Sequence, residues 1–241
     1  TYNEKALKIQ GTASGADTIS WVNHFLSTGQ ISLSQGQYND AIHSFKCALD
    51  LQKRYLLPNN PSFADTHNLI AGTYYQQQTF SEAIPYYQKV LDYKLNFLTD
   101  DDPNLAVFYC ILSTAYSGAL QYEKVLECLY TAVKQLRKRS NPNSSEVSQY
   151  MGQIGYVLTK QKKYSEAMDY YNESLSVRLT VGDDDNGSLE ECYGRIADAN
   201  EKLENYSEAL AFYEKKPDIE QKAFIIECST RFFSLVYSNP R

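Results

Sequence analysis

Residues 164–168 read Tyr164-Ser-Glu-Ala-Met168, and residues 206–210 read Tyr206-Ser-Glu-Ala-Leu210. Related strings occur upstream as Tyr38-Asn-Asp-Ala-Ile, Phe80-Ser-Glu-Ala-Ile and Tyr122-Glu-Lys-Val-Leu. Their aromatic residues stand at positions 38, 80, 122, 164 and 206, a constant step of 42 residues with no insertion or deletion. A fixed period of this length is typical of proteins built from stacked repeats.

Two further sets of positions keep the same period. Twelve residues before the Ala/Val position, every copy has a small residue: Gly29, Ala71, Ser113, Gly155 and Ala197. Four residues after it, every copy has a large one: Phe45, Tyr87, Leu129, Tyr171 and Tyr213. A small residue on one helix leaves space that a large residue of the partner helix can fill. The sequence therefore predicts that each repeat is a pair of closely packed helices.

A third set predicts where the first helix of each pair begins. It consists of residues whose side chains can accept a hydrogen bond from a free helical N–H: Thr18, Asn60, Asp102, Ser144 and Asn186. Pro61 and Pro103 follow two of them, at the first helical position, where proline is tolerated. The predicted first helices cover about 19–33, 61–77, 103–119, 145–161 and 187–203, and the second helices about 38–56, 80–97, 122–139, 164–180 and 206–216.

Both ends of the sequence depart from the complete repeat. Tyr2-Asn-Glu-Lys-Ala6-Leu7 is in phase with Tyr86-Tyr-Gln-Lys-Val90-Leu91, so we expect residues 1–17 to be the remnant of a preceding repeat, with its linker. Repeats follow at about 18–59, 60–101, 102–143, 144–185 and 186–217. Residues 218–241 are then expected to hold a terminal helix, near 219–237, whose apolar residues cap the last repeat.

The order of these positions resembles the tetratricopeptide repeat, in which a large residue, Leu and a small residue, Tyr, Ala, a second aromatic and another Ala follow at set offsets. The second repeat has this order in His67, Ile70, Ala71, Tyr74, Ala83, Tyr87 and Val90, and the third in Tyr109, Leu112, Ser113, Tyr116, Val125, Leu129 and Ala132. The 42-residue period is similar to that of kinesin-light-chain arrays. The resemblance covers about residues 2–216 and implies an all-α, right-handed superhelical solenoid of helical hairpins, which we take to be a single domain over residues 1–241.

The same resemblance implies that the first helices line a concave groove that holds a peptide. Kinesin-light-chain arrays repeat an asparagine there, and of the matching residues Leu26, Asn68, Cys110, Gly152 and Gly194 only one is asparagine. First-helix positions that are not needed for packing are mostly amide or hydroxyl side chains, which suit hydrogen bonds to a peptide main chain. We hypothesise a protein- or peptide-binding groove at Asn68, Tyr75, Gln76, Gln149, Gln153, Tyr156 and Arg195. The alternative is a solvated inner face without a ligand.

Three glycines lie inside predicted first helices, at Gly72, Gly152 and Gly194. Each costs roughly 0.5–1 kcal/mol of helix stability relative to alanine, so each needs a reason. One reason is close helix packing. The other is room for the backbone of a ligand.

Composition argues against several other functions. The net charge of −6 disfavours nucleic acid as the main partner, and no apolar run is long enough to span a membrane. The cysteines Cys47, Cys110, Cys128, Cys192 and Cys228 are odd in number and lack C-x-x-C spacing, which indicates reduced thiols in a cytoplasmic protein rather than disulfides or a zinc site. The basic residues Lys134, Arg137, Lys138 and Arg139 end a predicted helix, where they complement its dipole or form a docking patch.

No catalytic motif is present, and the three histidines do not have metal-ligand spacing; we assign no cofactor and no metal, and expect His67 to be a core residue. The predicted function is thus a non-catalytic interaction scaffold. The alternative is a self-assembly or spacer module of a larger multidomain protein that could include an enzyme, with the terminal helix forming a homo-oligomer contact.

Overall fold

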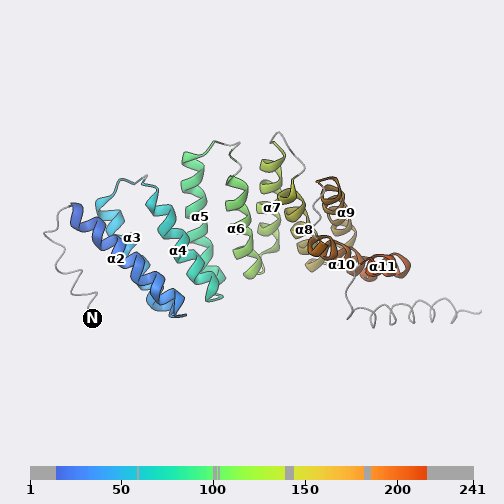
Figure 1. Cartoon of the computed structure of the whole chain (residues 1–241), viewed down its shortest axis with the longest axis horizontal. Coiled ribbons are helices and arrows are strands. Elements are labelled where there is room, and N and C mark those ends of the chain that lie inside the picture. The colour runs from blue at the N-terminus through green and yellow to red at the C-terminus, as the bar shows by residue number, and fades with distance from the viewer. Residues whose placement is uncertain are drawn as a thin grey trace, which may run out of the picture. The chain divides into compact units, whose positions relative to one another are not determined.

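The computed structural model of the chain describes residues 15–58, 60–99, 102, 104–138, 144–181 and 186–215 (Figure 1). These residues form helices α2 (Gly15–Ser34), α3 (Tyr38–Tyr55), α4 (Ser62–Gln76), α5 (Phe80–Phe97), α6 (Asn104–Gly118), α7 (Tyr122–Arg137), α8 (Ser145–Lys160), α9 (Tyr164–Val181), α10 (Asn186–Lys202) and α11 (Tyr206–Tyr213). The prediction of an all-α array of helical hairpins is confirmed, and most helix ends agree within two residues. Residues 1–14 of the predicted remnant repeat and the whole predicted terminal helix lie outside the described residues, whereas residues 15–17 belong to α2.

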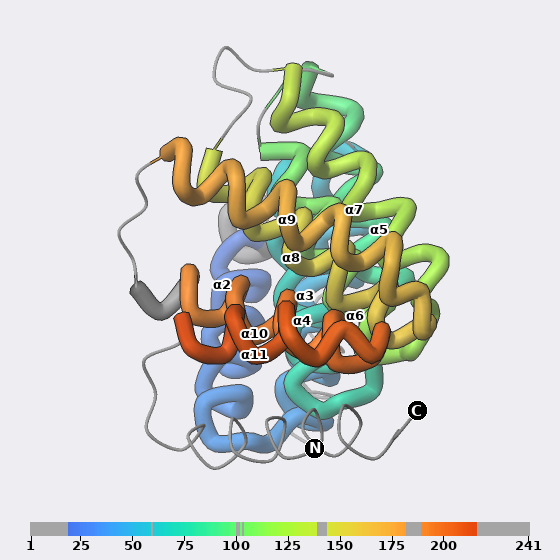
Figure 2. The backbone as a smooth tube through the Cα atoms, turned by 90° about the vertical axis from the view of Figure 1, so that its right-hand side faces the viewer, coloured from blue at the N-terminus to red at the C-terminus, as the bar shows by residue number. Residues whose placement is uncertain are grey.

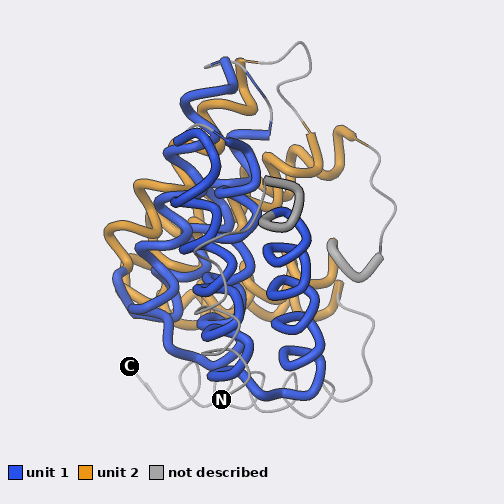
Figure 3. Tube along the Cα trace, turned by 90° about the vertical axis from the view of Figure 1, so that its left-hand side faces the viewer, with its two compact units in different colours: residues 1–121 blue, residues 122–241 orange. Residues whose placement is uncertain are grey.

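The chain divides into two compact units, residues 1–121 and 122–241 (Figure 3). In the first unit, α2 packs on α3, α3 on α4, α4 on α5 and α5 on α6. In the second unit, α7 packs on α8, α8 on α9, α9 on α10 and α10 on α11, and α8 also contacts α10 (Figure 2). Each helix therefore buries its apolar face against its neighbours in sequence, as expected of stacked repeats. One continuous solenoid over residues 1–241 stays a prediction.

The small and large residues meet as predicted in the first and fourth hairpins. A Cβ added to Gly29 would lie 2.5 Å from Phe45 Cε1, and one added to Gly155 would lie 2.5 Å from Tyr171 Cε1. Phe45 is fully buried and Tyr171 is 3% exposed. Only a residue without a Cβ can bring the two helices this close, which is the physical reason for glycine at these positions.

Side-chain caps begin three of the first helices, as the sequence predicted. The backbone N–H of Ser62 donates to Asn60 Oδ1 at 3.0 Å, that of Asn104 to Asp102 Oδ1 at 2.8 Å, and that of Val147 to Ser144 Oγ at 3.4 Å. The prediction was wrong at Thr18, because α2 already begins at Gly15 and places Thr18 inside the helix.

A recurring turn joins the first helix of each pair to the second. The residue that follows the first helix by two positions is left-handed in every copy: Gly36, Gln78, Leu120, Lys162 and Glu204, with φ between 57° and 72°. In the second copy the N–H of Thr79 donates to Tyr74 O at 3.0 Å and that of Gln78 to Tyr75 O at 3.0 Å. This is the Schellman arrangement, which satisfies the last carbonyls of a helix. The sequence gives little sign of it, since only one copy has glycine there.

The core holds polar groups that find partners. His67 is 3% exposed, which confirms its prediction as a core residue. Ser148 and Ser174 lie fully buried between α8 and α9, where Ser174 Oγ donates to Ser148 O at 2.8 Å. The four cysteines among the described residues are free thiols, and Cys47, Cys128 and Cys192 are buried.

Candidate functional site

The predicted site residues fall into two groups, one in each unit. Tyr156, Gln149 and Gln153 lie on α8, and Arg195 lies on α10, the next first helix of the same unit. The Tyr156 side chain is 43% exposed. Two cations lie over its ring: Lys160 Nζ, 5.0 Å from the ring centroid, and Arg195 Cζ, 5.8 Å from it. An aromatic ring that keeps this much accessible surface beside two cations is a suitable anchor for a partner.

Arg195 is held in place from two sides. One of its guanidinium nitrogens donates to Glu191 Oε1 at 2.5 Å, one helical turn earlier on α10. Its other terminal nitrogen lies 3.0 Å from the position that a Cβ on Gly152 would occupy. Gly152 therefore lets the guanidinium settle directly against the backbone of α8. Of the two reasons offered above for a glycine inside a first helix, close packing is therefore the one that applies to Gly152.

Amide side chains lie on the same helix as the aromatic anchor. Gln149 is exposed and lies about two turns before Tyr156, while Gln153 is half-buried. The structure therefore brings Tyr156 and Arg195 into direct contact and leaves Gln149 accessible beside them along α8.

Hydrogen bonds from the second helices α9 and α11 hold the first helices α8 and α10 that carry these residues. Tyr213 of α11 donates a hydrogen bond to Asp198 Oδ1 of α10 at 2.6 Å. The Tyr171 hydroxyl lies 3.1 Å from Thr159 Oγ1 of α8. Burial raises the pKa of Tyr171, and the nearby positive charge of Arg195 lowers it in part. Tyr171 thus stays a neutral hydrogen-bonding group at neutral pH, and it holds α8 against α9.

The other predicted residues lie on α4, in the first unit. Asn68 and Gln76 are exposed, and Tyr75 is 37% exposed with its ring edge-to-face against Phe80, 5.2 Å between centroids. Near Gly72, the closest atom to an added Cβ is the Tyr87 hydroxyl oxygen at 3.8 Å, an ordinary contact. A methyl group would therefore fit at Gly72, so close helix packing does not require a glycine at this position. Gly118, at the end of α6, packs closely against the Phe80 ring.

Three contacts of the second-unit group were not predicted from the sequence. The stacking of Lys160 on Tyr156 follows from their spacing of one helical turn and could have been found. The ion pair between Glu191 and Arg195 has the same spacing. The contact between Tyr156 and Arg195 had no such signal, because the two residues lie on different helices.

The described residues contain no group of three or more His, Cys, Asp or Glu side chains placed to hold a metal ion. None of the described helices combines the length and the apolar character needed to cross a membrane.

Comparison with protein families gives a match to the model described as Tetratricopeptide repeat, over residues 26–96 and 146–215. Together these two regions cover more than half of the chain. A comparison with curated proteins finds no match.

Solved structures with the same fold include repeats described as kinesin light chain nearly identical TPR-like repeats, from Podosopora anserina. They share 16% identity over 88% of this chain and 99% of that one, with a TM-score of 0.67. BtubC (BKLC) from P. vanneervenii matches 99% of this chain and 91% of its own at 14% identity and a TM-score of 0.65. Aspartyl phosphate phosphatase F from Bacillus subtilis matches 97% of this chain and 60% of its own at 18% identity and a TM-score of 0.67. Identities this low bear on the fold alone.

Proposed function

Because this chain belongs to the tetratricopeptide repeat family, we propose that it is a non-catalytic scaffold that binds a peptide segment of a partner protein on its first helices. The observation that carries the proposal is the half-exposed ring of Tyr156 between Lys160 and Arg195. Tyrosine and arginine are enriched among the residues that dominate the energetics of protein interfaces, and tyrosine buries a large surface with few rotatable bonds.

The binding surface proposed in the second unit has three parts. Tyr156 is the apolar anchor, and the amide of Gln149 offers both a donor and an acceptor to the main chain of an extended peptide. Arg195 is pre-positioned by Glu191, so little side-chain entropy is lost when a ligand arrives. Gln153 is proposed to contribute at the half-buried edge of the same surface.

A corresponding surface is proposed in the first unit, at Asn68, Tyr75 and Gln76. All three side chains are exposed on α4. Gly72 on the same helix supports this proposal, since an added Cβ would meet no atom closer than 3.8 Å and tight packing does not explain the glycine.

Site-specific photo-crosslinking tests the proposal. A benzophenone amino acid placed at Tyr156 should crosslink to a partner in the source cells, and the crosslinked partner segment is then identified by mass spectrometry. Leu179, 59% exposed on α9, provides the matched position on a second helix of the same unit. We expect a partner crosslink at position 156 and none at position 179.

A second experiment measures the energetic role of the anchor. Once the segment is identified, Tyr156→Ala should weaken its binding at least tenfold, while Leu179→Ala leaves binding unchanged. Equal affinities of the two variants would overturn the proposal. Crosslinks from position 156 only to a second copy of this chain would favour the self-assembly module instead.

A further inference from the structure

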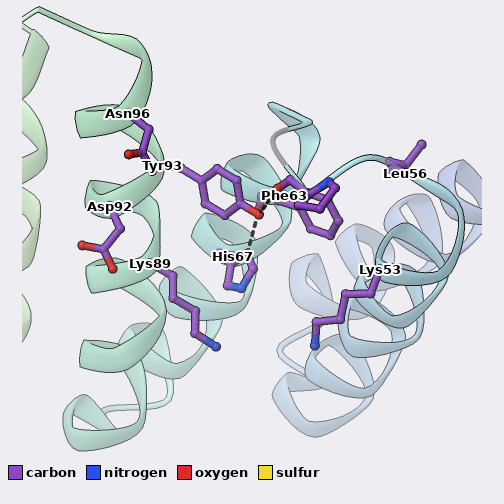
Figure 4. A pocket seen from close by; sticks show the side chains of 9 residues that line it. Lys53, Leu56, Phe63, His67, Lys89, Asp92, Tyr93 and Asn96 are labelled. Atoms are coloured by element: carbon purple, nitrogen blue, oxygen red, sulfur yellow. Dashed lines mark hydrogen bonds between the residues drawn. The ribbon is translucent and has the colours of Figure 1, made fainter.

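A cavity of about 520 Å³ opens on the first unit, and none of the residues proposed above for peptide binding lines it. It lies between the C-terminal halves of α3 and α5, over the beginning of α4 (Figure 4). Its lining combines apolar, aromatic and charged residues: Lys53, Leu56, Pro58, Phe63, His67, Lys89, Asp92, Tyr93 and Asn96. A volume of this size and a lining of aromatic groups with a few polar ones are typical of small-molecule sites.

The aromatic wall of this cavity is rigid. The rings of Phe63 and Tyr93 are stacked, with centroids 5.8 Å apart and planes at 13°. The Tyr93 hydroxyl donates to Pro58 O at 2.8 Å, which fixes the ring against the loop before α4. Below the rings, His67 Nδ1 lies 2.6 Å from Phe63 O and donates to it. The wall is therefore already in place without a ligand.

Two lysines face the cavity from opposite helices. Figure 4 shows Lys53 of α3 and Lys89 of α5 extending toward each other below His67, and Asp92 pointing away from them. Lys53 Nζ lies 3.7 Å from Asp50 Oδ1, but these side chains are 55% and 63% exposed, so their attraction is weak. Lys89 Nζ lies over the Tyr86 ring, 5.8 Å from its centroid, and forms no ion pair within the described part of the chain.

The second unit provides an internal comparison, two repeats or 84 residues further along the sequence. Lys53 corresponds there to Arg137, and Lys89 to Glu173. Arg137 and Glu173 form an ion pair across α7 and α9. A smaller cavity of about 360 Å³ lies beside this pair, with Met151 at the position of His67. A carboxylate thus occupies, in the second unit, the place that a second cation occupies in the first.

We infer that the cavity of the first unit is a binding site for a small amphipathic carboxylate, whose carboxylate lies between Lys53 and Lys89 and whose apolar group lies against Phe63, Tyr93 and Leu56. The ligand carboxylate supplies the charge that Glu173 supplies in the second unit. Two lysines that point toward one another repel, and an anion between them removes this repulsion. The site is independent of the peptide surface on the first helices, and neither proposal depends on the other.

Binding of 4-phenylbutyrate, an aromatic ring on a short chain with a carboxylate, tests this inference on the full chain. In two-dimensional amide NMR, it should shift the signals of residues 53–67 and 86–96. The amine analogue 4-phenylbutylamine keeps the apolar group and reverses the charge, and inorganic phosphate keeps only the negative charge. We expect each to bind at least tenfold more weakly than 4-phenylbutyrate.

Two charge variants complete the test. Lys89→Glu reproduces the arrangement of Arg137 and Glu173, so it should weaken 4-phenylbutyrate binding at least tenfold while the melting temperature is unchanged or higher. Glu173→Lys opens the ion pair of the second unit and should add a weaker second site, seen as new shifts in α7 and α9. The inference is overturned if Lys89→Glu binds 4-phenylbutyrate as tightly as the parent chain does. It is also overturned if inorganic phosphate or 4-phenylbutylamine binds the parent chain as tightly as 4-phenylbutyrate.

Discussion

The guanidinium carbon of Arg195 lies 5.8 Å from the centroid of the Tyr156 ring and so connects two successive first helices, α8 and α10. A cation over a half-exposed aromatic ring contributes about 0.5–1 kcal/mol. We expect a double-mutant cycle of Tyr156→Leu and Arg195→Gln to give a coupling of about this size in the free energy of unfolding. Urea unfolding of the four proteins measures it. Strictly additive effects would mean that the two side chains are neighbours without an energetic link.

Replacing two first-helix glycines with alanine should change the free energy of unfolding in opposite directions. A Cβ at Gly155 would lie 2.5 Å from the ring of Tyr171, which is buried and hydrogen-bonded to Thr159 and cannot retreat. Gly155→Ala should therefore lower the free energy of unfolding by about 1–3 kcal/mol. Gly72→Ala meets only the Tyr87 hydroxyl oxygen at 3.8 Å and should raise it by about 0.5–1 kcal/mol. Urea denaturation of the two variants and the parent chain measures both changes. If both variants are stabilised, or both destabilised, the prediction is contradicted.

The left-handed turn residues give a second matched pair. Leu120 has φ 57° and its side chain is 69% exposed. Its backbone is therefore strained, and packing of its side chain contributes little stability. Leu120→Gly should raise the free energy of unfolding by about 0.5–1 kcal/mol, because glycine removes a strain of about 1–2 kcal/mol and adds some unfolded-state entropy. Gly36→Ala, at the same position of the first turn with φ 72°, should lower it by about 1 kcal/mol. Thermal melts of both variants and the parent chain provide the measurement. A lower melting temperature for Leu120→Gly would contradict the claim that Leu120 is strained.

His67 should make the first unit sensitive to mild acid. Burial, followed by the charges of Lys89 and Lys53, lowers its pKa from the ordinary 6.5, although the hydrogen bond to Phe63 O opposes the shift. The unfolded chain then binds a proton at a higher pH than the folded chain does. This contribution to stability is complete above about pH 6.5 and is lost as the pH falls from there through the folded pKa.

The variant His67→Gln isolates this effect, since an amide can donate to Phe63 O but does not titrate in this range. Urea unfolding between pH 7.5 and 5 should show a smaller decrease of stability for His67→Gln than for the parent chain. The ring signals of His67 in NMR report its folded pKa directly. A value at or above 6.5 would contradict the prediction.

The amino-acid sequence by itself determined the repeat and its hairpins. A period of 42 residues, small residues such as Gly155 facing large ones such as Tyr171, and caps such as Ser144 are local or periodic signals, which act within one helix or between neighbouring helices. They predicted the helices within a few residues, and the burial of His67 with them. The start of α2 was missed, because Thr18 has the chemistry of a cap but lies in a helix that continues upstream of it.

Only the tertiary structure decided which side chains of different repeats meet. Arg195 lies over the Tyr156 ring, with its guanidinium beside Gly152 and close to the backbone of α8. Lys53 and Lys89 share a cavity because α3 and α5 both pack on α4, at a separation that side-chain volumes set and the period does not. Sequence spacing orders residues along a helix, whereas the distance between helices depends on how tightly all their intervening side chains pack.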